Sequence, residues 1–322
     1  MPVAVTRRPP PPGFFSFLKH GVLLPARHGG LFLPLLALTA ALAAGLLLAN
    51  SLAVQPLAAA VLLDADAISR AHPASASYPG LVRTLNGDLR RLLLEAAACL
   101  LAAVVLGSAI KIATVFATVA AFSGTGRAPT VCAVLGSAKA NLLGPVLTIA
   151  FGYVLEVACA AAIVALALLT VYLLEYSLLL LFLDALLVLL ASLFLVYFTV
   201  VCAVAVIVST AEPERRDVAA VSRAWRLMQG KNSQAALYIV ATCALGAVVS
   251  PVYTLALRWW PRSAGSGVAA GVAYVVLLGA VEVFSVAAVT AYYFECRDRK
   301  ELEEEMAGHR YAKLPNGDEA NI

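Results

Sequence analysis

The chain has 322 residues, of which 62% are hydrophobic and 13% are charged. Soluble domains are about half apolar and about a quarter charged, so this composition excludes an ordinary soluble protein and predicts an integral membrane protein. The net charge of +4 is small and the basic residues are spread over separate segments, which argues against nucleic acid as a partner.

The N-terminal segment, residues 1–30, is predicted to lie outside the membrane core. Residues 1–13 are basic and rich in proline, a composition that favours an extended, solvated chain. No apolar core with a cleavage site follows its arginine pair directly, so we expect no signal peptide. Residues 14–27 (FFSFLKHGVLLPAR) mix aromatic and basic side chains, which is typical of a segment lying on the membrane, and Pro25 is expected to end it.

Six apolar stretches are long enough to cross a bilayer, which takes about 20 helical residues. We place these spans at residues 31–52, 92–119, 142–170, 178–208, 235–257 and 267–294. The third and fourth are separated only by a turn at 172–177, where a glutamate and two tyrosines suit an interface. The predicted fold class is therefore all-α: a polytopic transmembrane helix bundle with short interfacial amphipathic helices.

This pattern divides the chain into the segment 1–30, a six-span domain at 31–294 and a charged cytosolic tail at 295–322. Within the six-span domain, residues 53–91 are predicted to form an outer loop and residues 210–234 a cytosolic amphipathic loop. The start of the outer loop, 54–63, is apolar and either extends the first helix or lies along the surface. The rest, 64–88, is polar and rich in turn-forming residues.

The distribution of basic residues predicts the sidedness of the protein. With the N-terminus in the cytosol, sixteen of the 23 Lys and Arg residues fall on the cytosolic side, six on the other side, and Lys111 within a span. The positive-inside rule therefore predicts that both termini are cytosolic, although four basic residues in the first outer loop reduce the bias. Both the plasma membrane and an endomembrane fit this pattern.

A charged helix is predicted at 217–232 (DVAAVSRAWRLMQGKN), between two long apolar runs. Val218, Val221, Trp225 and Met228 recur at helical spacing and form its apolar face. A helix with a tryptophan on one side and basic residues on the other suits the boundary between acyl chains and anionic headgroups. We therefore expect anionic membrane lipids as partners. The residues predicted to lie at this interface are Arg215, Arg216, Arg223, Trp225, Arg226 and Lys231.

Two other basic segments, 14–30 and 130–141, also precede a pair of spans. One hypothesis is that the chain consists of three units, each an interfacial helix followed by a helical hairpin. The alternative is that loops between spans are in general short, basic and rich in small residues.

Two stretches of the sequence resemble a plant family of multi-pass membrane proteins of uncharacterised function. They are VVCAVAVIVSTAEP followed by AVSRAWRLMQGKNSQAALYIV, within 200–240, and VTAYYFECRDR at 289–299. The pattern also resembles, more faintly, the membrane regions attached to some bacterial glycerophosphodiester phosphodiesterases. The resemblance implies a six-span layout in a eukaryotic membrane and assigns no catalytic or ligand-binding residue.

The sequence predicts no catalytic, cofactor-binding or metal-binding residue, and we expect that the protein is not an enzyme. The four histidines are far apart, and none of the common nucleophile-elbow or phosphate-loop motifs occurs. Of the six cysteines, most fall inside spans and are expected to be small buried hydrophobes. Cys296, at the end of the last span, is a candidate for S-palmitoylation.

Lys111, Glu156 and Glu282 lie deep within spans, where an ionised group is costly and usually faces a partner or a cavity. Lys111 and Glu282 each lie about 15 Å from the cytosolic side at about 1.5 Å per residue, so their equal depth predicts an ion pair. Such a pair either clamps two helices together or forms part of a polar path. Gly267 and Gly271 add a spacing of small residues that allows close helix packing.

Two function classes remain. We expect a non-catalytic membrane protein that organises anionic lipid or cytosolic partners through its basic interfacial helices. Its charged tail is then either a solvated surface or a docking surface for a cytosolic protein. The alternative is a carrier or channel for a small solute or lipid, with Lys111, Glu156 and Glu282 in its path.

Overall fold

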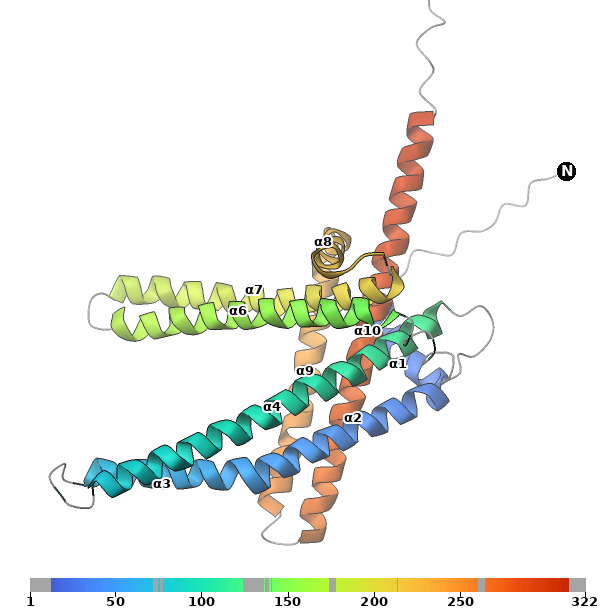
Figure 1. Ribbon diagram of the computed structural model, residues 1–322. Helices are drawn as coiled ribbons and strands as arrows, with labels where there is room; N and C mark the ends of the chain where they lie inside the picture. The colour runs from blue at the N-terminus through green and yellow to red at the C-terminus, as the bar shows by residue number, and fades with distance from the viewer. Residues whose placement is uncertain are drawn as a thin grey trace, which may run out of the picture. The chain divides into compact units, whose positions relative to one another are not determined.

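The computed structural model describes residues 13–71, 75, 78–123, 136, 139, 141–173, 178–212, 214–259 and 264–312. In this part of the chain every regular element is a helix (Figure 1). The α-helices are α1 Ser16–Arg27, α2 Gly29–Ala49, α3 Gln55–Arg70, α4 Tyr78–Phe122, α6 Leu143–Leu173, α7 Leu178–Ala211, α8 Asp217–Met228, α9 Asn232–Trp259 and α10 Ala264–Ala312. A π-helical segment, η1 Asn50–Val54, joins α2 to α3.

Within the described residues, six helical segments are long and apolar enough to cross a membrane. They are Gly29–Arg70, Tyr78–Phe122, Leu143–Leu169, Leu178–Ala211, Asn232–Ala256 and Gly265–Leu302. Each of the six predicted spans coincides with one of them. The prediction of an all-α, polytopic transmembrane protein is therefore confirmed.

The predicted outer loop at 53–91 is helical over most of its described length. For 54–63 this agrees with one of the two alternatives, an extension of the first helix, whereas the turn-rich loop predicted at 64–88 is wrong for its described residues. Helix α3 continues from η1 to Arg70, and α4 begins at Tyr78. The segment is rich in Ala and Leu, and Pro56 and Pro79 stand in first turns, where a missing N–H is tolerated. At about 1.5 Å per residue, the 45 residues of α4 extend about 68 Å. Because the hydrocarbon core is only about 30 Å thick, the charged start of α4 extends beyond it.

Most of the predicted interfacial segment 14–27 forms helix α1, and Pro25 does not end it. The helix continues to Arg27, and the N–H of His28 donates to the carbonyl of Leu24 at 3.1 Å. Proline removes only its own N–H from the helix, which is a small loss so close to the C-terminus. The middle segment of the proposed repeat, 130–141, lies almost entirely outside the described residues.

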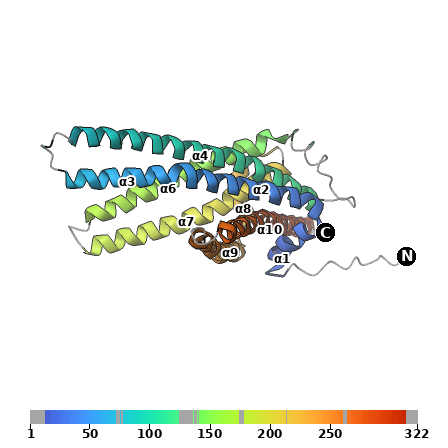
Figure 2. The same cartoon turned by 90° about the horizontal axis from the view of Figure 1, so that it is seen from below.

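The chain divides into two compact units. Unit 1 comprises Met1–Leu31, Val115–Ala244 and Phe284–Ile322, and unit 2 comprises Phe32–Thr114 and Leu245–Val283. In unit 2, α2 with α3 and the first part of α4 run side by side (Figure 2). Here α10 approaches α2 closely at Gly279, where an added Cβ would lie 3.2 Å from Cδ1 of Leu36. Gly271, where the sequence predicted close packing, has no such neighbour within 4 Å.

In unit 1, α6 and α7 form a helical hairpin (Figures 1 and 2). Helix α6 ends at Leu173 and α7 begins at Leu178, and the turn predicted at 172–177 lies mostly outside the described residues. The core of the unit is formed by the last third of α7, the second half of α10 and the buried side of α8. Its largest fully buried side chains are Phe17, Val115, Val201, Val204, Ile207, Val208, Leu227, Met228, Tyr292 and Tyr293.

Candidate functional site

The candidate site is the end of unit 1 at which α8 is docked. Figure 1 shows α8 nearly end-on, whereas α7 and α10 lie along the page, so α8 is steeply inclined to both helices. The chain enters α8 at Asp217, whose φ of 51° lies in the left-handed region that aspartate tolerates better than most residues. The N–H of Asp217 donates to Oγ1 of Thr148 on α6 at 3.3 Å. This contact fixes the start of α8 against the hairpin.

The side of α8 that faces the protein consists of Ala220, Ala224, Leu227 and Met228, all of which are buried. Their spacing is the helical spacing of one face, and the two alanines allow a close approach. The predicted apolar face of Val218, Val221, Trp225 and Met228 is therefore only partly the packing face. Met228 is buried, but Val218 is 62% exposed and Trp225 is 38% exposed.

Helix α8 consequently has three faces instead of two. At about 100° per residue, Val218, Val221 and Trp225 form an open apolar face directly beside the buried one. Ser222, Arg223 and Arg226 follow on the remaining, polar side. A helical wheel finds both apolar faces, but it does not show which of them packs against the protein.

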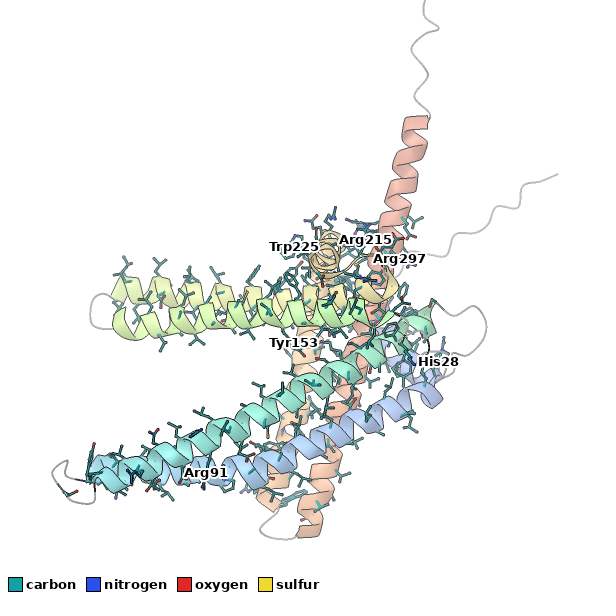
Figure 3. The ribbon with its side chains drawn as sticks, viewed as in Figure 1. His28, Arg91, Tyr153, Arg215, Trp225 and Arg297 are labelled. Carbon is teal, nitrogen blue, oxygen red and sulfur yellow. The ribbon has the colours of Figure 1, made fainter. Side chains whose placement is uncertain are left out.

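Trp225 of α8 packs against α7. Its ring makes an edge-to-face contact with Tyr197, with the ring centroids 5.7 Å apart. The hydroxyl of Tyr197 donates to Oδ1 of Asn232, at the start of α9, at 3.3 Å. Trp225 is thus held in one position while more than a third of its surface stays open (Figure 3).

The carboxylate of Glu212, just after α7, joins three parts of the site. It accepts a hydrogen bond from the hydroxyl of Tyr293 on α10 at 3.1 Å. It also pairs with Nε of Arg215 at 2.9 Å and, more distantly, with Nε of Arg223 on α8 at 3.9 Å. We did not single out Glu212 from the sequence, although an acidic residue between an apolar run and a basic pair is a signal that could have found it. Arg215 and Arg223, predicted to face lipid headgroups, therefore have a protein partner.

The other three predicted cations differ in their exposure. Arg216 and Arg226 are exposed, and Nε of Arg226 lies 3.4 Å from the carbonyl of Ser222 in its own helix. Lys231 is half-buried, and its Nζ donates to the backbone carbonyl of Glu295 on α10 at 3.2 Å. The structure thus assigns Arg216 and Arg226 to the outer surface and Lys231 to the contact with α10.

Helix α1 packs against α10 at the same end of unit 1. Phe17 is fully buried and its ring contacts that of Tyr292, with centroids 5.8 Å apart. Gly21 meets Ala288 so closely that an added Cβ would lie 2.8 Å from the Cβ of Ala288. The hydroxyl of Ser16 also donates to the carboxylate of Glu295. The N-terminal helix is therefore docked on the protein as well as being apolar enough for a membrane surface.

A depression, here called the basic depression, lies between the end of α8 and α10. Its lining residues are Leu227, Gln229, Lys231, Cys296, Arg299 and Lys300. Cys296 is only 1% exposed, so an acyltransferase would reach its thiol only after α10 opened locally. This burial disfavours the predicted palmitoylation, which stays a prediction.

The intramembrane charges do not form the predicted pair. Lys111 is half-buried on α4 and Glu282 is exposed on α10, both in unit 2. Among the described residues, no ion pair joins them. Equal depth fixes the position of a side chain along its helix but not the direction in which it points. Glu156 belongs to unit 1, where it lies half-buried on α6 and has an interaction partner in the protein.

Within the described ranges, no group of three or more His, Cys, Asp or Glu side chains is placed to hold a metal ion. The site is instead a set of cations, aromatic rings and two partly buried carboxylates.

A family model described as "Domain of unknown function (DUF8558)" matches residues 13–306. The chain belongs to this family. The DUF8558 match begins before α1 and ends within α10, so α1 and α8 are both parts of the family domain. No curated protein and no solved structure matches the chain. The resemblances of the DUF8558 chain to a plant family and to the membrane regions of bacterial phosphodiesterases stay predictions.

Proposed function

We propose that this protein is a non-catalytic, multi-pass membrane protein whose helix α8 lies in the membrane plane and binds anionic lipid. The observation that supports this most directly is the combination of the inclination of α8 and its three faces. The steep inclination of α8 to both α7 and α10 supports this proposal, because a helix so inclined would be near the membrane plane whichever of the two stands closer to the membrane normal.

The open faces of α8 have the chemistry that an interfacial amphipathic helix needs. Val218 and Trp225 are exposed on the apolar side, and Arg226 is exposed on the polar side next to it. Such a helix buries its apolar face at the boundary of the acyl chains and places its cations among the headgroups. Each basic residue near an anionic leaflet contributes about 1 kcal/mol of attraction.

The sidedness and the cellular setting belong to the same proposal. Sixteen of the 23 basic residues fall on one side of the predicted six-span topology, and six crossings place both termini on one side. We assign that side to the cytosol. The part of the tail that follows the buried Cys296 is then available to a cytosolic protein. The stretches within 200–240 and 289–299 support a plant membrane as the setting.

The carrier or channel remains the second hypothesis from the sequence. It requires Lys111, Glu156 and Glu282 to share a polar path. Because Lys111 and Glu282 form no ion pair in unit 2, the structure gives this hypothesis no additional support, and the lipid-binding function is the one that we put forward.

Spin labels on neighbouring positions of α8 test its placement. In a variant whose native cysteines are replaced, single cysteines at Val218 and Trp225 report on the apolar face, and those at Ala219 and Arg226 on the polar face. In vesicles, we expect labels at 218 and 225 to collide more often with oxygen, and labels at 219 and 226 more often with a water-soluble nickel complex. Val218 and Ala219 are matched neighbours on different faces. Equal profiles at the four positions would disprove an in-plane helix.

The lipid preference has an intrinsic reporter. The chain contains three tryptophans, so a variant with Trp259 and Trp260 changed to phenylalanine keeps Trp225 alone. The remaining Trp225 should be quenched more strongly by brominated phosphatidylserine than by brominated phosphatidylcholine. Arg226→Gln should reduce this difference, whereas Arg83→Gln, a neutralisation on α4, should not. Equal quenching by the two lipids in the unmodified site would contradict the proposed preference.

A further inference from the structure

The basic depression concentrates positive charge in a fixed place. Three of its six lining side chains, those of Lys231, Arg299 and Lys300, are cationic, and Gln229 adds a carboxamide. None of the described residues that line it is acidic. The C-terminal carbonyls of α8 contribute a partial negative charge of about half an elementary charge, which the three cations exceed several-fold. The depression therefore favours an anion.

Lys231 is held in place from both its backbone and its side chain. Gly230 has a φ of 89°, which glycine adopts without strain, and the resulting turn lets the N–H of Lys231 donate to the carbonyl of Met228 at 3.0 Å. The hydroxyl of Tyr292 donates to the carbonyl of Lys231 at 3.4 Å. With one N–H of its ammonium directed to Glu295, the group still has two donors for a ligand.

The two other cations come from one turn of α10. Arg299 and Lys300 are consecutive residues, and α10 places them one turn beyond Glu295 and Cys296. The depression thus receives cationic donors from two segments that the Lys231–Glu295 hydrogen bond connects. A ligand with several charged oxygens on one atom can contact both segments at once, whereas a single carboxylate offers only two oxygens.

We infer that the basic depression binds a terminal phosphate monoester. Such a group has a charge of about −1.5 to −2 near neutral pH and three strong acceptor oxygens, which match three cationic side chains. A phosphodiester has a single charge and matches them less well. The phosphate can be part of a lipid headgroup or of a soluble molecule. Basic pockets beside transmembrane helices are known to bind phosphorylated headgroups, and Leu227 and Cys296 give the depression an apolar part as well.

The lipid form of this inference rests on the proposed function, because a headgroup reaches the depression only if the α8 end of unit 1 faces a leaflet. The soluble form does not. Binding is therefore measured on the full-length protein in detergent with three probes: dioctanoyl phosphatidylinositol 4-phosphate, dioctanoyl phosphatidylserine and inorganic phosphate. Native mass spectrometry or isothermal titration gives the dissociation constants.

The test variant replaces Lys231, Arg299 and Lys300 together by glutamine. The control replaces three exposed cations elsewhere, Lys19, Arg27 and Arg83, by glutamine, so that the net charge changes equally. We expect the test variant to lose about tenfold or more in affinity for the phosphoinositide, since each charge-assisted hydrogen bond contributes strongly. The control should lose less than about twofold, since charges that do not line the depression act only through screened attraction.

The outcomes decide whether the basic depression binds a phosphate and whether that phosphate belongs to a lipid. If the test variant loses affinity for the phosphoinositide, and inorganic phosphate displaces the phosphoinositide from the unmodified protein, the depression is a general phosphate site. If the test variant loses affinity but inorganic phosphate does not displace the phosphoinositide from the unmodified protein, the depression binds a phosphate that is part of a lipid. An equal loss in the control, or no loss in the test variant, overturns the inference.

A third variant protects the test against misfolding. The exchange Lys231→Arg, Arg299→Lys and Lys300→Arg conserves all charges and should retain binding within a few-fold. If the charge-conserving variant binds the phosphoinositide and the glutamine variant is folded but does not bind it, the charges are responsible for binding. If each of the two variants binds the phosphoinositide and phosphatidylserine with equal affinity, the inference fails. The difference in accessibility between spin labels at 218 and 219 should persist in the glutamine variant, because it depends on the placement of α8 and not on these three charges. Failure of this inference and failure of the proposed function are therefore told apart.

Discussion

The contact between α1 and α10 gives the sharpest stability prediction. Gly21 is buried, and a Cβ added there would lie 2.8 Å from the Cβ and 3.0 Å from the Cα of Ala288. Ordinary contacts of this kind are 3.4–4 Å long, and neither atom belongs to a flexible side chain that could rotate away. Gly21→Ala therefore forces α1 to move away from α10.

The magnitude follows from two opposing effects. Overpacking of a well-packed contact costs about 1–3 kcal/mol, and replacing a helical glycine by alanine returns about 1 kcal/mol. We expect Gly21→Ala to lower the free energy of unfolding by about 1 kcal/mol, with an upper limit of about 2 kcal/mol. Gly30→Ala is the matched control, because Gly30 is also helical, lies in the same unit and has no neighbour within 4 Å of an added Cβ.

Thermal unfolding of the purified protein can be followed with a dye that fluoresces on reaction with thiols. Cys202 and Cys296 are buried in unit 1 and become reactive when this unit unfolds. We expect Gly21→Ala to unfold about 2–4 °C below the unmodified protein, while the control should unfold at the same temperature or slightly higher. Adding Ala288→Gly to Gly21→Ala should recover most of the loss. If Gly21→Ala proves as stable as the control, the close packing of α1 on α10 is refuted.

Three further predictions concern polar contacts and backbone geometry in unit 1. Glu212→Ala should cost about 1–3 kcal/mol and increase the mobility of a spin label on α8, because Tyr293 and Arg215 lose their acceptor and Arg223 loses its ion-pair partner; the exposed Glu214→Ala should change neither. The hydroxyls of Thr118 and Thr290 lie 3.1 Å apart, so each valine substitution should cost about 0.6–1.7 kcal/mol and the double substitution less than the sum, in the same unfolding assay. Gly230→Ala should cost about 1 kcal/mol because its φ is 89°, and Gly230→Asn should cost less; equal stability of all three proteins would contradict the left-handed turn.

The spans could be predicted because a bilayer requires one long apolar helix for each crossing, and this requirement is visible in a single sequence. The existence of α8 could be predicted as well, since Gly230 marks its end and charged residues interrupt the apolar runs around it. The helical course of residues 64–70 and of the start of α4 was not predicted. Arg and Asp were taken there as signs of a loop, although both are compatible with a helix that extends beyond the membrane.

The packing of α8 shows why its role was only partly predictable. Ala220 and Ala224 are small and contribute little to an apolar pattern, yet they form the centre of the docked face. Val218 and Trp225 contribute strongly to the pattern and remain open. In a membrane protein a large apolar residue is at least as suited to the lipid as to the core, so the rule that the largest hydrophobic residues face inward does not apply to such a helix.

The contacts of Glu212 were beyond prediction for a different reason. Its partners include Tyr293, which is 81 residues away in the sequence, and no periodic signal connects the two. The same limit applies to Lys111 and Glu282, for which the sequence gives a depth but no direction.

The partly buried charges and the small residues of α8 are best understood together. Helices in a bilayer are not driven together by the hydrophobic effect, because lipid tails are as apolar as leucine. A helix at the interface, where we propose that α8 lies, therefore needs specific contacts to keep one orientation. Helix α8 has such contacts in the alanine face, in the pairing of Arg223 with Glu212 and in the contact of Trp225 with Tyr197. Because these contacts are made within the protein, the open apolar face and Arg226 are oriented before any lipid arrives. An orientation set in advance lowers the entropy that lipid binding would otherwise cost.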